Sequence, residues 1–377
     1  MARSALLVFL FALVAVLLVP STVALLAGER LSSPALELPP TPGSPPGGWP
    51  GVETPPVPGQ PGGRAGAAAA PGEGPSPGAG PAAALPSAES LVSVYDEQAG
   101  QLLRMPLETY VAGVVAAEMP AGFALPALEA QAVAARTFAV AQLVAGTARC
   151  PLRPEADFCS DGRHGQAWAS PAERRRFWGV LAPVYEAKIE QAVQATAGEV
   201  LLWRGEPIEA FYSASAGGRT ASAREVFGLD LPYLPSRPSP DADRPTPART
   251  TRLPIAKAAR ALGIDPGQLQ PAGGQAGTPM ATVVARTPSG RAAEVRVGDR
   301  SFSGTDFRQR LGLPSTLIES LAVRGGELVV ETRGYGHGVG LSQYGAAAMA
   351  QQGDSAQAIL AYYYPGTRLA HLPPAPV

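Results

Sequence analysis

The stretch LETYVAGVVAAEMPAGFALPALEAQAVAARTFAVAQLV, residues 107–144, predicts two consecutive helices. Apolar residues recur at helical spacing over 107–117, which indicates a helix with one buried face. Pro120 ends that helix, because proline disfavours helical geometry at the residue before it. Pro126 opens the second helix, since proline is tolerated in a first turn, and the alanine-rich course over 127–144 favours a long, closely packed helix.

Short strands and further helices surround this pair in the sequence. The predicted strands are 92–95 with a run continuing to 105, a pair at 199–202 and 207–212, a hairpin at 283–286 and 292–297, and 327–332. The further predicted helices are 183–195, 255–262, 303–313, 341–352 and 355–364. We expect irregular loops at 150–165 and 235–250. Because strands and helices mix without a regular βαβ alternation, the sequence predicts an α+β fold.

The N-terminal segment, residues 1–28, carries a long apolar run over 5–19 after a single early charge. Small residues at 22–24 suit cleavage of a secretory signal peptide. The apolar run also extends to a marginal membrane-spanning length, so an uncleaved signal anchor is an equally good interpretation. Under both interpretations we expect the rest of the protein to be exported to the cell envelope, either membrane-anchored or secreted.

The segment 29–88 is rich in proline, glycine and alanine and has few aromatic residues. Such a composition cannot bury enough apolar surface to form a core, so we expect a disordered linker. Residues 89–377 then form the folded region, which we divide into a core at 92–235, an insert at 236–300 and a C-terminal part at 301–377. The formal net charge of −1 argues against a nucleic-acid-binding protein.

The chain has two cysteines, Cys150 and Cys159. In an exported protein, such a pair is expected to form a disulfide, because the extracytoplasmic environment is oxidising. A zinc site is the alternative, and it needs further ligands beside this pair.

Glu118 is the carboxylate that suggests chemistry, since it falls at or near the C-terminus of the first helix. The negative end of a helix dipole disfavours ionisation of an acid placed there. Apolar neighbours, among them Met119 and Phe123, would desolvate the carboxylate and raise its pKa further. An acid with a raised pKa keeps its proton near neutral pH until it protonates a leaving group. The alternative is an acid that follows a helix and is simply solvated.

A glycine-rich segment near the C-terminus, GYGHGVGLSQYGA at 334–346, surrounds His337 with five glycines. A flexible loop is the plainer interpretation, and the spacing does not match the dinucleotide-binding fingerprint. We interpret the segment as a loop that approaches a bulky ligand closely and leads into a helix through Ser342 as N-cap. Because the flanking glycines leave little side-chain packing to bury it, we expect His337 to belong to a site rather than to the core.

A set of short motifs follows the same order as in a known family. They are YVAGVVAAEMPA at 110–121, LEAQAVAART at 128–137, AGEVL at 197–201, YSASAGGRT at 212–220, the segment 304–313, GHG at 336–338 and YYPGT at 363–367. In this order the motifs resemble stage II sporulation protein D and its relatives. The resemblance spans about 92–369, essentially the whole folded region, so it is specific.

The resemblance implies a peptidoglycan lytic transglycosylase that cuts glycan strands, preferably strands without stem peptides. The catalytic acid/base glutamate of the family maps onto Glu118. One carboxyl group suffices, because it protonates the glycosidic oxygen and then acts as a base while the 6-hydroxyl of muramic acid closes onto C1. Hydrolysis instead uses a second carboxylate or a positioned water. Some relatives are described as amidase enhancers, so the alternative is a non-catalytic peptidoglycan-binding protein whose partner is a cell-wall amidase.

The resemblance also implies a substrate cleft between the Gly217–Gly218 turn and the His337 loop. The residues it implies for substrate binding are Gln131, Arg136, Ser213, Ser215, Gly217, Gly218, Arg219, His337, Ser342, Gln343 and Tyr344. Buried structural pairing is an alternative for Gln131 and Arg136. A turn that simply needs glycine is the alternative for residues 213–219. Ser213 replaces a histidine of some relatives, which preserves hydrogen bonding to sugar but not proton transfer.

Some family members hold zinc with a cysteine directly after a histidine, where this chain has Gly165 after His164. Cys159 and His164 are the remaining candidate ligands, with Cys150 as a substitute from a different position. We therefore expect no metal cofactor, and a disulfide between Cys150 and Cys159 in its place.

Overall fold

The computed structural model describes residues 85–87, 89–242, 248–269 and 280–374. The predicted N-terminal segment 1–28 and nearly all of the predicted linker 29–88 therefore lie outside the described residues. Within the described ranges, no helix combines the length and the apolar character needed to cross a membrane. These ranges mix helices with short strands, which agrees with the predicted α+β class.

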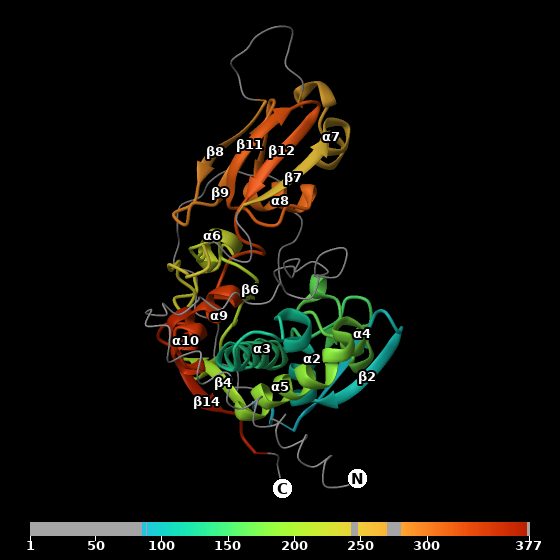
Figure 1. Cartoon of the computed structure of the whole chain (residues 1–377), viewed down its shortest axis with the longest axis vertical. Coiled ribbons are helices and arrows are strands. Elements are labelled where there is room, and N and C mark those ends of the chain that lie inside the picture. Colours follow the sequence, from blue (N-terminus) through green and yellow to red (C-terminus); the bar gives the residue numbers. More distant parts are fainter. Residues whose placement is uncertain (1–84, 88, 243–247, 270–279, 375–377) are drawn as a thin grey trace, which may run out of the picture. The chain divides into compact units, whose positions relative to one another are not determined.

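The first hydrophobic core is built around helix α3 (Leu125–Ala145), which packs against α2 (Leu107–Glu118), α5 (Ala182–Ala195) and strand β4 (Glu199–Trp203). Figure 1 shows α2, α3 and α5 side by side. Both helices predicted from the opening stretch are confirmed. The first helix ends before Pro120. Pro126 lies in the first turn of the second helix, where proline is tolerated because its missing N–H would have no partner within the helix.

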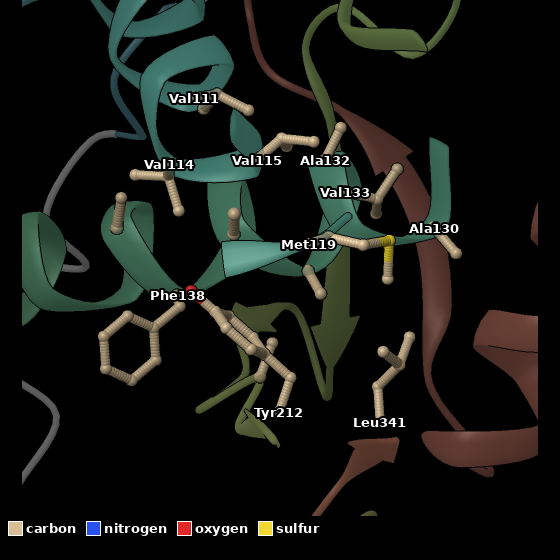
Figure 2. Close-up of a cluster of buried hydrophobic side chains, with 14 of the residues drawn as sticks. Val111, Val114, Val115, Met119, Ala130, Ala132, Val133, Phe138, Tyr212 and Leu341 are labelled. Atoms are coloured by element: carbon tan, nitrogen blue, oxygen red, sulfur yellow. The ribbon is translucent and has the colours of Figure 1, made fainter. Parts of the chain in front are cut away.

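Figure 2 shows the buried side chains where α2 and α3 meet. The cluster includes Val111, Val114 and Val115 of α2, Ala132 and Val133 of α3, and Met119, Tyr212 and Leu341. Burial of a large aliphatic side chain contributes about 1.5–3 kcal/mol to folding. The cluster therefore fixes the end of α2 against segments that lie far away in the sequence.

Two very short strands carry these distant segments. Strand β6 (Tyr212–Ser213) pairs in parallel with β13 (Leu341–Ser342). The predicted pairing of 207–212 with 199–202 is therefore only partly right, because within 207–212 only Pro207, at the end of β5 (Glu206–Pro207), pairs with β4. An apolar pattern identifies a half-buried strand but does not identify its partner, and here the partner lies more than a hundred residues later.

A second hydrophobic core extends from Leu253 to Val330. It contains two three-stranded sheets, in the orders β10-β9-β8 and β11-β12-β7, with two helices. Their bounds are β7 (Arg249–Pro254), α7 (Ile255–Leu262), β8 (Ala281–Arg286), β9 (Ala292–Val297), β10 (Arg300–Ser303), α8 (Gly304–Leu311), β11 (Ile318–Arg324) and β12 (Glu327–Thr332). The predicted hairpin of β8 with β9 is confirmed. The division of the folded region into an insert at 236–300 and a C-terminal part at 301–377 stays a prediction.

Several short elements complete the described part of the chain. They are β1 (Leu91–Asp96), β2 (Gln101–Pro106), β3 (Phe158–Cys159), α4 (Pro171–Trp178), α6 (Ala223–Phe227), α9 (Gln343–Gln351), α10 (Ala356–Tyr363) and β14 (Arg368–His371). The sequence analysis missed α4 and α6, which are short and polar. Both begin with a serine–glutamate capping box, which is a signal that could have found them.

Candidate functional site

Glu118 is the last residue of α2, and its side chain is 8% exposed. Its Oε1 accepts a hydrogen bond from the backbone N–H of Ala167 at 2.7 Å. Its Oε2 is buried and has no hydrogen-bond partner among the described residues. Because buried polar atoms normally have a partner, this oxygen is the one left for a ligand or a water.

The environment of Glu118 keeps it protonated at a higher pH than usual. Burial raises its pKa from the usual 4.5 to about 7, and the hydrogen bond from Ala167 opposes part of that rise. Desolvation dominates because surroundings of low polarity penalise the charged form. The raised pKa predicted from the sequence is confirmed, and the alternative of a solvated acid is wrong.

A buried glutamine beside Ala167 joins three elements of the first core. Gln166 Oε1 accepts a hydrogen bond from the Tyr212 hydroxyl at 2.7 Å. Its Nε2 donates to the Ala135 carbonyl at 3.2 Å and to the Tyr110 hydroxyl at 3.4 Å. The sequence analysis missed Gln166, because its partners come from β6, α3 and α2 and no local pattern indicates them.

Trp168 packs directly over the backbone of α2 at Gly113. A Cβ built on Gly113 would lie 2.1 Å from Trp168 Nε1. The backbone N–H of Ala169 also donates to the Gly113 carbonyl at 3.1 Å. Glycine is therefore needed at this helical position, because any larger residue would push away the segment that carries the donor to Glu118.

Gly113→Ala is expected to destabilise the protein by about 1–3 kcal/mol, because the added methyl overpacks against a buried indole. Helix propensity alone predicts a gain in stability for this substitution, since alanine is favoured over glycine in a helix by about 1 kcal/mol. Urea unfolding followed by circular dichroism measures the difference. Gly122→Ala is the control, since its Cβ would meet only the Tyr185 hydroxyl at 3.9 Å. A gain in stability for Gly113→Ala would contradict this packing.

The Gly217–Gly218 turn is organised by Asp241, which is 0% exposed. Asp241 Oδ2 accepts hydrogen bonds from the Ala216 N–H at 2.6 Å and from the hydroxyls of Ser215 at 2.9 Å and Ser342 at 2.6 Å. Its Oδ1 accepts the N–H of the second turn glycine at 3.0 Å. One buried carboxylate therefore holds the turn and the end of β13 together.

Ser215 and Ser342 are occupied by this arrangement. Ser342 also accepts the N–H of Gly345 at 3.2 Å, so the predicted N-cap of the helix after the glycine-rich segment is confirmed. Both serines are buried with their hydroxyls on Asp241. Their hydroxyls therefore have a structural role in the turn, and the substrate-binding role implied for the two residues stays a prediction.

Arg291 supports the same turn from the second core. It donates to the Ala216 carbonyl at 2.9 Å and to the Arg219 carbonyl at 3.0 Å. Burial lowers its pKa to about 10, so the guanidinium stays charged near neutral pH. The sequence analysis missed both Arg291 and Asp241, because each lies in a segment without a local signal and acts on residues far away in the chain.

His337 is buried, which contradicts the expectation from its flanking glycines. Its side chain is 5% exposed and packs against the rings of Phe211 and Phe227, with centroids 6.0 and 5.3 Å away. Its Nδ1 accepts the N–H of Val339 at 3.0 Å. Burial, with help from Arg308 and Arg291, lowers its pKa to about 3, so the imidazole is neutral at ordinary pH. Distant aromatic residues therefore supply the packing that the flanking glycines do not, and the role of His337 in a site stays a prediction.

Arg136 is also a structural residue. Its guanidinium is 0% exposed and forms two hydrogen bonds with the Glu108 carboxylate, at 2.8 and 2.5 Å. It also donates to the carbonyls of Glu199 and Val193. The alternative of buried pairing therefore holds for Arg136, and its implied contact with substrate stays a prediction.

Gln131, Gln343 and Ser213 are buried, and two of them have a polar atom without a partner among the described residues. Gln343 Nε2 donates to Gln131 Oε1 at 3.2 Å. Gln131 Nε2 and Ser213 Oγ have no hydrogen-bond partner within the described ranges. These two atoms are suitable points for a ligand or water, and the role of the three residues in substrate binding stays a prediction.

The more accessible predicted site residues are Gly218, Arg219 and Tyr344. Tyr344 contacts Phe123 edge to face, with ring centroids 5.0 Å apart. Phe123 belongs to the loop that follows Glu118. The contact therefore brings the helix after the glycine-rich segment beside the end of α2, as a shared site requires.

The two cysteines form a disulfide, Cys150–Cys159, as predicted. Glu97, Cys159 and His164 offer donor atoms that lie within 4.8 Å of one another. Cys159 has no thiolate in the disulfide, and Glu97 with His164 supplies two donors where a structural zinc site takes about four. These residues do not fit zinc in the oxidised protein.

Reduction of the disulfide is expected to lower the free energy of unfolding by about 2–3 kcal/mol, because it frees a closed loop between residues nine apart. Chemical denaturation with and without reductant measures the effect. A double variant, Cys150→Ala with Cys159→Ala, is the control and should not respond to reductant. An unchanged native protein after complete reduction would contradict the expectation.

Comparison with known proteins supports the family resemblance that the motifs indicate. The family model described as stage II sporulation protein, SpoIID, matches residues 95–203. Stage II sporulation protein D of Bacillus subtilis (strain 168) is 35% identical over 280 residues, which cover 74% of this chain and 78% of that protein. The protein of the same name from Bacillus amyloliquefaciens gives the same identity and coverage. An amidase enhancer of Bacillus subtilis (strain 168) is 30% identical over 314 residues, which cover 68% of this chain and 40% of that protein.

Proposed function

Because the chain belongs to the stage II sporulation protein D family, we propose that it is a peptidoglycan lytic transglycosylase with Glu118 as its acid/base. The observation that supports this most is a buried carboxyl with a pKa of about 7 and one oxygen that has no hydrogen-bond partner among the described residues. Such a group carries its proton near neutral pH and can transfer it to a leaving group. The proposed substrate is a glycan strand without stem peptides.

The two oxygens of Glu118 take different roles in this proposal. Oε1 accepts the Ala167 N–H, so the proton of the neutral acid resides on Oε2. Oε2 gives that proton to the glycosidic oxygen as the bond from this oxygen to C1 breaks. The carboxylate then takes a proton from the 6-hydroxyl of muramic acid as that oxygen closes onto C1. The acid is regenerated, and no water enters the product.

A single carboxyl group is consistent with the surroundings of Glu118. Burial raises its pKa, the hydrogen bond from the Ala167 N–H lowers it in part, and no second carboxylate of the described residues contributes to the shift. Glycosidases that hydrolyse with two carboxyl groups hold them about 5–10 Å apart, where the charges influence one another. The isolation of Glu118 therefore favours attack by the sugar's own hydroxyl.

The remaining parts of the proposal concern the substrate cleft, the cofactor and the location. We propose that Gln131, Ser213, Arg219 and Tyr344 contact the sugar in a cleft beside Glu118, and that no metal takes part. We also propose that the protein is exported to the cell envelope, with residues 1–28 as a signal peptide or membrane anchor.

Product analysis tests the reaction. The full chain is incubated with purified glycan strands that lack stem peptides, and the fragments are identified by mass spectrometry. We expect 1,6-anhydromuramic acid ends, at a rate that falls as pH rises through about 7, because Glu118 then loses its proton. Added zinc or a chelator should leave the rate unchanged. Strands that stay intact, or fragments with ordinary reducing ends, would refute the proposal.

The similarity to a protein named amidase enhancer favours a second candidate function. In this case the chain binds glycan strands without cutting them and stimulates a cell-wall amidase. A pull-down with purified strands distinguishes the two functions. Binding without cleavage, equal for the native chain and for Glu118→Gln, would support the second candidate.

A further inference from the structure

We propose that Gln166, held by Tyr212, is the positioning residue that aims the Ala167 N–H at Oε1 of Glu118 and so reserves Oε2 for the substrate. The inference rests on the proposed function for its catalytic meaning, although the geometry behind it is independent of the reaction. Gln166 does not touch Glu118 itself. It acts through the peptide bond that joins it to Ala167.

The side chain of Gln166 is fixed at both ends. Its carbonyl oxygen accepts the Tyr212 hydroxyl at 2.7 Å, and its amide nitrogen donates to the Ala135 carbonyl at 3.2 Å and to the Tyr110 hydroxyl at 3.4 Å. The residue is buried. An amide in which the oxygen only accepts and the nitrogen only donates has one satisfied orientation here, because a flipped amide would place its oxygen against the Ala135 carbonyl oxygen, an acceptor against an acceptor.

The backbone after Gln166 is fixed as well. Trp168 N–H donates to the Ser160 carbonyl at 2.9 Å, and Ala169 N–H donates to the Gly113 carbonyl at 3.1 Å. The peptide that carries the Ala167 N–H therefore has a fixed side chain before it and two backbone hydrogen bonds after it. This preorganisation holds the donor 2.7 Å from Glu118 Oε1.

Tyr212 connects this arrangement to the glycine-rich segment. It belongs to β6, which pairs with β13 inside that segment. The titratable groups that face Glu118 among the described residues are Tyr212 and Tyr110, and burial raises the pKa of both tyrosines. Both hydroxyls therefore remain neutral at working pH, so the Tyr212 hydroxyl stays a donor to Gln166. The only charge that changes near neutral pH in this group is that of Glu118.

The test measures the pKa of Glu118 without using activity. The full chain is labelled with ¹³C at glutamate carboxyls, the Glu118 signal is assigned by its loss in Glu118→Gln, and the signal is followed against pH. In Tyr212→Phe and Gln166→Leu we expect the pKa to rise from about 7 to about 8, since a loosened Ala167 N–H no longer favours the charged form. Tyr363→Phe is the control, because it removes a buried hydroxyl that bonds Ser239 instead.

Each outcome decides one part of the inference. A raised pKa in both variants, with the native value in Tyr363→Phe, supports it. A native pKa in a folded Tyr212→Phe protein overturns the role of Tyr212, and a native pKa in both variants overturns the whole inference. If the pKa shifts but the native chain cuts no glycan, the positioning stands and the proposed function fails. If the chain cuts glycan and the pKa does not shift, the reverse holds.

Discussion

Glu118→Gln is expected to slow glycan cleavage by about a thousandfold and, above about pH 7, to make the folded protein more stable. The loss of activity follows because glutamine has the shape of the neutral acid but no proton that it can transfer, and such transfer contributes about 10²–10⁴ in rate. The gain in stability follows from the same burial that raises the pKa of Glu118.

The sign of the stability effect follows from the two pKa values. The carboxyl has a pKa of 4.5 in the unfolded chain and about 7 in the folded one. The neutral carboxyl contributes fully to the free energy of unfolding below about pH 4.5. This contribution is lost as pH rises to about 7, and the loss amounts to about 3 kcal/mol. Glutamine carries no charge and escapes that loss. The variant should therefore exceed the native protein by up to about 3 kcal/mol at alkaline pH and match it in acid.

Denaturant titrations across this pH range, paired with the cleavage assay, check both effects. Glu206→Gln is the matched control, because that carboxylate is exposed on β5 and should change neither property. Equal cleavage by Glu118→Gln would refute its role as acid/base. If the variant is less stable than the native chain at alkaline pH, burial does not disfavour the charged form of Glu118, and the raised pKa is contradicted.

Asp241→Asn is expected to destabilise the protein by about 3 kcal/mol or more. The carboxylate accepts hydrogen bonds from backbone N–H groups at Ala216 and Gly218 and from the hydroxyls of Ser215 and Ser342, with no exposed surface. An amide in the same place presents a donor to at least one of those donors. Buried donors that lose their acceptor cost about 1–3 kcal/mol each, and more where the partner was charged.

Thermal or urea unfolding of Asp241→Asn measures this loss. Asp230→Asn is the control, because Asp230 is exposed and pairs with the exposed Arg224, so a change below about 1 kcal/mol is expected. A small effect at Asp241 would mean that the backbone hydrogen bonds between the two glycine-rich segments, including those of β6 with β13 and of Ser215 with Tyr335, suffice to hold the segments together. Residual cleavage by the folded variant would report how much the Gly217–Gly218 turn matters for activity.

Local chemistry explains which elements were predictable. Pro120 and Pro126 mark the boundary between α2 and α3, and the cap at Ser342 is readable because serine precedes a run of helix formers. The position of Glu118 at the end of α2 follows from the same prolines, because Pro120 ends the helix. The capping boxes at Ser170 and Ser222 were equally readable, but their helices lack an apolar stripe.

Long-range contacts explain what the sequence could not reveal. Gln166, Asp241 and Arg291 look like ordinary loop residues, and each becomes important only when tertiary structure supplies partners from other elements. The same limit misplaced His337, because Phe211 and Phe227 bury it and neither ring is near it in sequence. A sequence pattern within one segment predicts the secondary structure of that segment. The hydrogen-bond partners of its polar side chains depend on the whole fold.

Cleavage in water enriched in ¹⁸O tests most directly whether one buried carboxyl drives an internal displacement. Glycan strands without stem peptides are treated with the full chain in this solvent, and the new ends are weighed by mass spectrometry. Attack by the 6-hydroxyl predicts new ends that contain no ¹⁸O at any pH where cleavage occurs. New reducing ends that carry ¹⁸O would mean that water attacks C1, and Glu118 would then be working with a second catalytic group in a hydrolase.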